Sequence, residues 1–370
     1  MGHRVQYLIK SGGSRTGYYS QWGGLTLELD LLAGPETALR FVRGQRAVGG
    51  WLNEMQCDGA AIIDPDERRL LWFSHYLRDA AYRAAVLEVM TLTWQGWRLD
   101  WAYDGLREIV DALGEDGRKV QRLRTIPVPD DLRTPEEFMS AMPQFHLSPE
   151  AFPPGSEMPR ELPLGTPVPA PAPDDDEPEL ACLVTVVKNG LTRAYMADMD
   201  ASWVIESGVD SLTDLYEKWE PVTRWPSFPS SGVHLNADSR TGGAWTFSAL
   251  NQVLNDAETF WPGWRWEFWR DRYREHLNRI GTAIDLPGID FKAGLQELRS
   301  KFDAHQVMDK GTRAASMLLG LIGALRSAAE SNELTVQTES ANAMVHRPMD
   351  LTPEEKGRVH AALTALRYRS

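Results

Sequence analysis

The sequence predicts an α+β protein built from two tandem duplicated α+β units and a C-terminal helical region. Two segments, residues 93–114 and 260–281, align without a gap and share eight identical residues among 22 positions. A proline-rich stretch separates the two copies, and helical patterns follow the second one. A motif that recurs at equivalent places in two units serves the structure first. The identical pairs are Trp94/Trp261, Gly96/Gly263, Trp97/Trp264, Arg98/Arg265, Asp104/Asp271, Arg107/Arg274, Glu108/Glu275 and Gly114/Gly281.

Each unit is expected to run hairpin, helix, hairpin, helix, strand, helix. Strand-like residues 5–9 and 18–22 flank a Ser-Gly-Gly-Ser turn in the first unit. Their counterparts, residues 183–187 and 194–199, flank an Asn-Gly pair. Asn-Gly between strand-like runs is a strong hairpin signal, because both residues tolerate the left-handed conformation of a two-residue turn.

The second hairpin of each unit combines a polar turn with a strand that ends in aromatic residues. Residues 59–74 parallel residues 232–248, and Asp64 in the first turn lies opposite an asparagine in the second. Asp and Asn favour such turns because their side chains bond to nearby backbone N–H groups. Aligning the aromatic ends of the strands places His75 opposite Ala249.

The chain is expected to divide into four regions. Residues 1–146 form the first unit, 147–180 a proline-rich acidic linker, 181–284 the second unit, and 285–370 the helical region. Residues 152–178 carry nine of the 23 prolines, and proline is excluded from helix interiors and central strands. The linker is therefore expected to be extended, either as a spacer or along the surface of one unit.

Three helices are expected in the C-terminal region. Apolar residues recur at helical spacing in residues 290–304, and residues 312–329 are rich in Ala and Leu. The third helix opens with Thr352 as N-cap, Pro353 at its first position and Glu355 as the capping-box partner. These helices have no counterpart after the first unit, so we expect them to cover a sheet edge or the groove between the units.

Composition narrows the class of partner. The net charge of −13 over 370 residues argues against a general nucleic-acid binder and favours attraction to a basic partner. No apolar run approaches the roughly 20 residues that a membrane span needs. Cys57 and Cys182 occupy non-equivalent places and form no metal motif. We expect a cytoplasmic protein without cofactor or metal, and the oligomeric state is open.

The repeated Trp-x-Gly-Trp-Arg string has a structural and a functional interpretation. In the structural one it is a helix end, a glycine turn and a strand that carries paired charges on one face. In the functional one it forms a recognition patch, because Trp and Arg often dominate protein interfaces. The structural interpretation is favoured because both units keep the pattern. The expected ion pairs are Arg98–Asp100 and Arg265–Glu267, and the candidate partner-binding residues are Trp97, Arg98, Asp100, Trp264, Arg265 and Glu267.

An enzyme is the alternative function. Asp64 and Asp66 share one turn and His75 follows the next strand, so a hydrolase or transferase could use these groups at a site between the units. The sequence contains no phosphate-binding P-loop and no Gly-x-Ser-x-Gly elbow. No catalytic constellation is therefore predicted, and the trio stands as the alternative.

The N-terminal region resembles a group of uncharacterised bacterial proteins. These proteins open with Met-Gly-His-Arg, as residues 1–4 do, and carry a tyrosine-rich second strand like Tyr-Tyr-Ser-Gln-Trp at residues 18–22. The resemblance covers roughly the first 110 residues and implies no activity. By class, an acidic, Trp-rich bacterial α+β protein is similar to the immunity proteins of polymorphic toxin systems. That analogy implies a protein-binding function in which the chain occludes a toxin domain.

Overall fold

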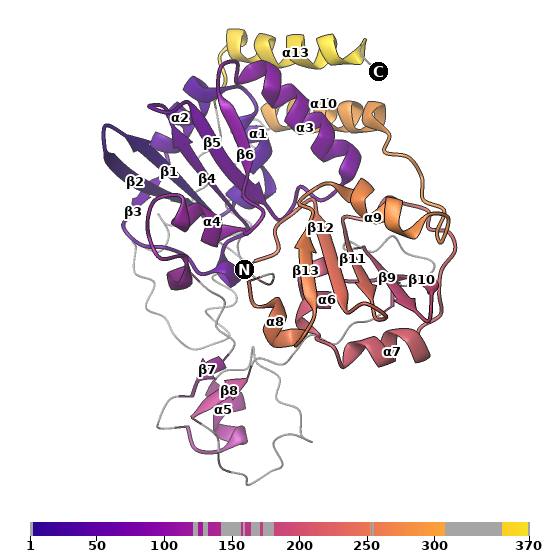
Figure 1. Cartoon of the computed structure of the whole chain (residues 1–370). Helices are drawn as coiled ribbons and strands as arrows, with labels where there is room; N and C mark the ends of the chain where they lie inside the picture. Colours follow the sequence, from indigo (N-terminus) through magenta and orange to yellow (C-terminus); the bar gives the residue numbers. More distant parts are fainter. Residues whose placement is uncertain are drawn as a thin grey trace. The chain divides into compact units, whose positions relative to one another are not determined.

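The computed structural model confirms the α+β class. It describes residues 3–120, 125–128, 132–141, 157, 160–163, 171–172, 181–251, 253, 255–307 and 350–368. Two mixed sheets dominate the larger of two compact units, which comprises residues 1–121 and 168–370 (Figure 1). We call residues 3–120 the first lobe and residues 181–285 the second lobe.

The first lobe is a six-stranded sheet in the order β3-β2-β1-β4-β5-β6. Neighbouring strands pair antiparallel, except that β1 lies parallel to β4 and β5 parallel to β6. The strands are β1 (Val5–Ser11), β2 (Ser14–Ser20), β3 (Arg46–Val48), β4 (Gly59–Asp64), β5 (Arg69–Ser74) and β6 (Arg98–Trp101). The helices are η1 (Gly23–Leu25), α1 (Leu27–Leu31), α2 (Pro35–Arg43), η2 (Glu54–Gln56), α3 (Ala80–Thr93), α4 (Leu106–Asp111) and η3 (Gly117–Val120).

The second lobe repeats this order of strands without an equivalent of β3. Its sheet runs β10-β9-β11-β12-β13, and the parallel pairs are β9 with β11 and β12 with β13. The strands are β9 (Cys182–Lys188), β10 (Leu191–Ala197), β11 (Ser231–Asn236), β12 (Thr241–Thr246) and β13 (Arg265–Phe268). The helices are α6 (Ala201–Glu206), α7 (Ser211–Glu217), α8 (Ala257–Phe260) and α9 (Tyr273–Ile280). Origin of the lobes by duplication stays a prediction from the sequence.

Alternate residues of β9 enter two different cores, as the two-residue period of a strand requires. Val184 and Val186 pack in a cluster with residues of α6 and α7, whereas Leu183 packs in a second cluster with Ile280 of α9. The second sheet is therefore covered on both faces, and α9 lies on the face opposite α6.

The register corrects the predicted alignment of the second hairpins. In the first lobe Asp64 pairs with Arg69, and in the second lobe Asn236 pairs with Thr241, so the two turns have equal length. Counting along the strands from these turns, His75 corresponds to Phe247 and not to Ala249. The alignment by aromatic residues was wrong because Trp72 and Trp245 stand one position apart in the register.

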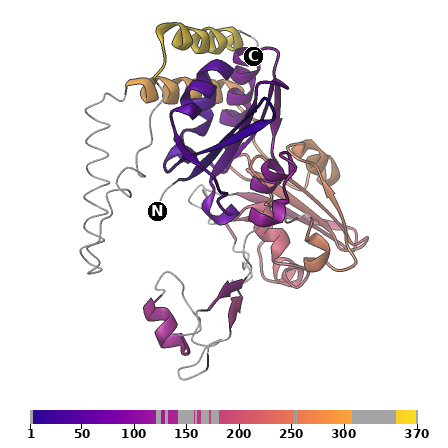
Figure 2. The same cartoon turned by 90° about the vertical axis from the view of Figure 1, so that its left-hand side faces the viewer.

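The C-terminal helices pack on the first lobe. Helices α10 (Phe291–Val307) and α13 (Pro353–Arg367) both contact α3 and each other (Figure 2). At Gly294 of α10 a Cβ atom would stand 2.1 Å from the carbonyl oxygen of Ala81, so only glycine permits this approach. The predicted cap is confirmed: Thr352 and Glu355 form a capping box, with Pro353 in the first turn. The predicted helix at residues 312–329 lies outside the described residues.

Residues 122–167 form a second, smaller compact unit. It contains β7 (Thr125–Pro127) paired antiparallel with β8 (Glu161–Pro163), and the helix α5 (Pro135–Ala141). The strand β8 falls inside the segment expected to be an extended linker. Among the described helices, none combines the length and apolar character needed to cross a bilayer.

Candidate interaction surface

The repeated tryptophans Trp97 and Trp264 serve mainly as internal packing. Each stands just before an edge strand and meets a fully buried tryptophan edge-on: Trp97 with Trp94 at 5.1 Å between ring centres, and Trp264 with Trp261 at 4.9 Å. Trp264 is 9% exposed, and Trp97 is half-buried. These two rings therefore offer little surface to a partner.

The charged residues of the same string lie on the outermost strands, β6 and β13. In β6 the predicted pair is confirmed, since Arg98 Nε lies 2.8 Å from Asp100 Oδ2, and Arg69 joins the same oxygen at 2.6 Å. Charged side chains on an edge strand discourage pairing with another sheet. Exposed ion pairs of this kind contribute about 1 kcal/mol or less.

In β13 Glu267 forms its ion pair with Arg279 and not with Arg265, the partner expected from the sequence. Glu267 Oε2 lies 2.7 Å from Arg279 of α9 and accepts the indole N–H of Trp269 at 3.0 Å. The Trp269 hydrogen bond and then the charges of Arg279 and Arg265 lower the pKa of Glu267. In the described part of the chain, Glu267 is therefore bound to α9 through Arg279. Arg265 affects the Glu267 carboxylate only through its charge.

Asp64 and Asp66 connect the turn between β4 and β5 to the hairpin of β1 and β2. Asp64 accepts the N–H groups of Asp66 and Glu67 at 3.1 and 2.9 Å and lies 2.9 Å from Lys10 Nζ. Burial raises the pKa of Asp64, but these hydrogen bonds and the Lys10 charge outweigh burial and hold it below its usual value. Asp66 accepts the N–H of Gly12 at 2.6 Å.

The second lobe has the same connection between its two turns, which supports a structural role for Asp64 and Asp66. Asp238, the counterpart of Asp66, accepts the N–H groups of Asn189 and Gly190 at 2.7 and 2.8 Å. These two backbone hydrogen bonds lower the pKa of Asp238. Among the described residues, no group of three or more His, Cys, Asp or Glu is arranged to hold a metal ion.

His75 lies at the opposite end of strand β5 from Asp64. Six residues of extended chain span roughly 20 Å. His75 Nδ1 is hydrogen-bonded to Ser248 Oγ at 3.0 Å, and burial together with the Arg78 charge lowers its pKa to about 3. The structure therefore does not bring Asp64, Asp66 and His75 together at one site.

Four side chains, three of them exposed, form an aromatic and apolar surface at the end of the first sheet where His75 lies. Trp22, Leu25 and Tyr76 are 38%, 51% and 39% exposed. The His3 ring contacts both aromatic rings, at 5.9 Å from Trp22 and 5.2 Å from Tyr76 between ring centres. We call His3, Trp22, Leu25 and Tyr76 the His3 patch.

Backbone contacts hold the His3 patch in place. Gly24 donates its N–H to the carbonyl of His3 at 2.8 Å, and its Cα approaches so closely that a Cβ atom would lie 3.1 Å from both His3 and Asp58. The Tyr76 hydroxyl is hydrogen-bonded to His3 Nδ1 and reaches Asp58 Oδ1 at 3.5 Å. Asp58 in turn accepts the N–H of Arg4 at 2.7 Å. The patch is therefore a fixed surface with one carboxylate beside it.

The second lobe buries the equivalent positions. The register of β1 and β9 makes Met199 the counterpart of Trp22, and the hairpin register makes Ser248 the counterpart of Tyr76. Met199 and Ser248 are 8% and 1% exposed. At these positions only the first lobe presents large side chains to solvent.

The sequence reasoning did not select the His3 patch, although a signal for it was present. The two strings that carry the family resemblance contribute His3 and Trp22, which meet in space. Tyr76 follows β5 and Asp58 directly precedes β4, and no local pattern links these two residues to the N-terminus. Their proximity follows from the parallel pairing of β1 with β4.

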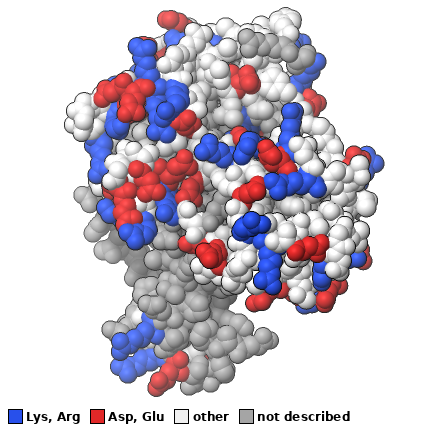
Figure 3. All heavy atoms as spheres, in the orientation of Figure 1, with Lys and Arg blue, Asp and Glu red and all other residues white. Residues whose placement is uncertain are grey.

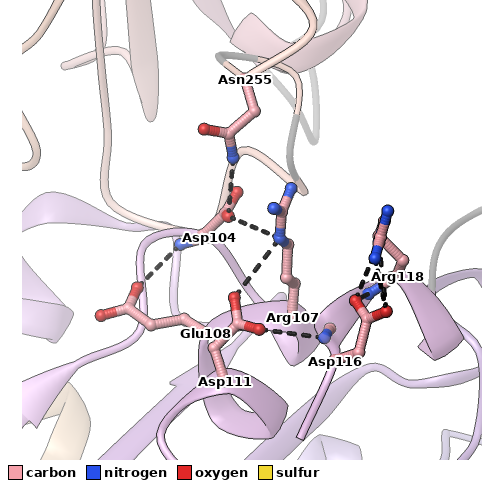
Figure 4. A network of polar contacts seen from close by, with 8 residues as sticks. Asp104, Arg107, Glu108, Asp111, Asp116, Arg118 and Asn255 are labelled. Carbon is pink, nitrogen blue, oxygen red and sulfur yellow. Dashed lines mark hydrogen bonds and ion pairs between the residues drawn. The ribbon is translucent and has the colours of Figure 1, made fainter.

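Charge is mixed on the face that Figure 3 shows. Where charged side chains lie on that face, Lys and Arg mostly adjoin Asp and Glu. The surroundings of α4 illustrate the pattern, because Arg107 lies 3.4 Å from Asp111 and Arg118 lies 2.9 Å from Asp116 (Figure 4). Asn255 of the second lobe donates to Asp104 at 3.2 Å in the same network. These carboxylates are engaged with neighbours of the same chain.

Comparisons with known proteins add no relative, since no protein-family model, no curated protein and no solved structure matches the chain. What the protein does is therefore inferred from its own surface.

Proposed function

We propose that the protein binds a second protein through the His3 patch and acts as an immunity protein that occludes a toxin domain in the bacterial cytoplasm. The observation that carries this proposal is the exposure of Trp22, Leu25 and Tyr76 around His3 on a fixed end of the sheet. Aromatic residues in contact with solvent are typical of interface centres, and contiguous apolar surface on a folded protein marks an interaction site.

The partner's chemistry follows from the same surface. An apolar pocket or groove would receive Trp22 and Tyr76, and a basic residue at its rim would meet Asp58. The net charge of −13 supports this choice because it attracts a basic partner and speeds encounter. Since the structure leaves Asp64, Asp66 and His75 apart, no observation on the described residues favours the hydrolase or transferase alternative.

The test uses matched tryptophan substitutions. Trp22→Ala/Tyr76→Ala removes the patch, whereas Trp203→Ala removes a tryptophan of similar exposure, 41%, from α6 in the second lobe. Tagged wild-type and variant chains would be used to capture partners from the native host, and the co-eluting protein would be purified for titration calorimetry.

We expect the patch variant to bind the partner at least about 30-fold more weakly, because the loss of even one interface-centre aromatic costs about 2 kcal/mol. The Trp203→Ala chain should bind like wild type. Equal binding by wild type and patch variant would show that the His3 patch is not the binding surface. A partner that does not arrest growth when expressed alone would refute the immunity role and leave the binding role standing.

A further inference from the structure

The second lobe buries a series of hydrogen-bonded polar side chains at positions where the first lobe buries apolar side chains. Strand and helix registers make Thr185, His234 and His276 the counterparts of Leu8, Ile62 and Ile109. All three polar side chains are buried, Thr185 and His276 completely. Polar groups in a core cost stability unless they are fully hydrogen-bonded, so their presence at positions that accept Leu and Ile calls for an explanation.

Hydrogen bonds connect these residues in a single donor-to-acceptor direction, which begins at Trp245 and ends at His234. The indole N–H of Trp245 donates to His276 Nδ1 at 3.1 Å. His276 Nδ1 is therefore an acceptor, and Nε2 carries the proton that is donated to Thr185 Oγ1 at 2.6 Å. The Thr185 hydroxyl then donates its own proton to His234 Nδ1 at 2.9 Å. Both imidazoles are neutral in this arrangement, and both Nδ1 atoms are already occupied as acceptors.

We propose that this chain of Trp245, His276, Thr185 and His234 is an acid-sensitive latch that holds α9 on the second sheet. A proton taken from solvent by His276 Nδ1 would turn that atom into a donor facing the Trp245 N–H. A proton on His234 Nδ1 would likewise face the Thr185 hydroxyl. The first event breaks the link between α9, which carries His276, and β12, which carries Trp245. The second removes the acceptor of the Thr185 hydroxyl and so breaks a link between β9 and β11, on which α9 rests.

The charged surroundings oppose protonation. Arg279 of α9 acts on both imidazoles, and Glu267 of β13 is engaged with Arg279 at 2.7 Å. Tyr273 of α9 also faces this site, with its ring 6.0 Å from the Trp245 ring between ring centres. Burial and then Arg279 lower the pKa of His234 to about 4; burial, His234 and Arg279 lower that of His276 well below its usual value.

The direction of the pH effect follows from linkage. A histidine in the unfolded chain takes up a proton near pH 6.5, whereas in the folded lobe it resists protonation. The latch therefore contributes its full stability above pH 6.5. Each histidine lowers the folding equilibrium about tenfold per pH unit as the pH falls below about 6.5, and for His234 this continues to about pH 4.

Hydrogen–deuterium exchange of the full chain tests the proposal. Peptides covering α9 would be compared with peptides covering α4, the matched helix of the first lobe, between pH 7 and pH 4.5 after correction for intrinsic exchange. We expect the protection of α9 to fall at least tenfold more than that of α4. Equal pH dependence of the two helices in wild type would overturn the latch.

Two variants separate titration from packing. His276→Gln keeps one acceptor and one donor but does not titrate, so the acid loss of α9 protection should shrink by about tenfold per pH unit. The apolar triple variant Thr185→Val/His234→Ile/His276→Ile should remove the excess pH dependence of α9. Both variants retain His75, which titrates independently of the latch. Unchanged acid sensitivity of α9 in a folded variant of either kind would contradict the proposal.

Discussion

Trp94 and Trp261 show how single side chains join distant segments. Each indole N–H donates to a carbonyl in the last turn of a short helix, Leu31 at 2.8 Å and Ile205 at 2.7 Å. Beside them, a Cβ at Gly34 would stand 2.6 Å from the carbonyl of Thr93, so the residue there has to be glycine. The repeated tryptophans are thus explained by packing, whereas the exposed residues of the His3 patch are not.

Glu355 gives a prediction at the residue scale. Its carboxylate accepts hydrogen bonds from Arg40 at 2.6 and 2.7 Å and from Thr37 at 2.6 Å, which tie α13 to α2. The Arg40 hydrogen bond, then that of Thr37, outweighs burial and lowers the pKa of Glu355 to about 2.

Because this pKa is depressed, the stabilisation is complete above pH 4.5 and disappears as the pH falls to about 2. We expect Glu355→Gln to lower the free energy of unfolding at pH 6 by about 2 kcal/mol, and the difference from wild type to close towards pH 2. Urea denaturation across this range measures it. A difference that is constant with pH would show that the ionised carboxylate is not responsible.

At the scale of elements, α3 distinguishes the two lobes. It has 14 residues, whereas its counterpart α8 has four, and α10 and α13 pack on α3. A longer helix in the first lobe thus provides the surface on which the C-terminal helices dock. The sequence predicted α10 and the cap of α13 but left open what they cover.

Two glycines test this docking. Gly294→Ala places a methyl group against the Ala81 carbonyl and should cost about 1–3 kcal/mol, with loss of protection in α10. Gly357→Ala in α13 meets nothing within 4 Å and should stabilise the chain by about 0.5–1 kcal/mol, because alanine favours helix. Chemical denaturation of both variants measures the contrast. Equal effects of the two substitutions would mean that α10 does not depend on this close approach.

At the scale of the whole molecule, Arg83 of α3 joins the lobes. It is 4% exposed, lies 3.2 Å from Asp271 of the second lobe, and stacks over Trp101 at 4.6 Å and Phe247 at 5.5 Å. A buried guanidinium depends on its carboxylate partner, since removing the partner leaves an uncompensated charge.

The repeat offers a matched control for this contact. Asp271→Asn should cost about 3 kcal/mol, because it leaves Arg83 buried without its charge partner. Asp104→Asn at the equivalent position of the first lobe should cost about 1 kcal/mol or less, since its partner Arg107 is 25% exposed at the side chain and lies 3.9 Å away (Figure 4). Calorimetric unfolding of both variants compares them. Similar losses would show that Arg83 is not the residue that makes Asp271 important.

The sequence by itself determined the α+β class, the order of elements in each lobe, helix α10 and the Thr352 capping box. These features depend on local periodicity, turn chemistry and caps, which neighbouring residues specify. It also predicted the Arg98–Asp100 pair, because alternate residues of a strand share a face.

Only the tertiary structure decided the register that aligns His75 with Phe247, the exposure of Trp22 and Tyr76, and the burial of Thr185, His234 and His276. These depend on pairing between strands far apart in the chain, as when β1 and β4 bring His3 to Tyr76. Composition cannot reveal such contacts, because a tryptophan or histidine has the same local signature whether its neighbours leave it in solvent or enclose it.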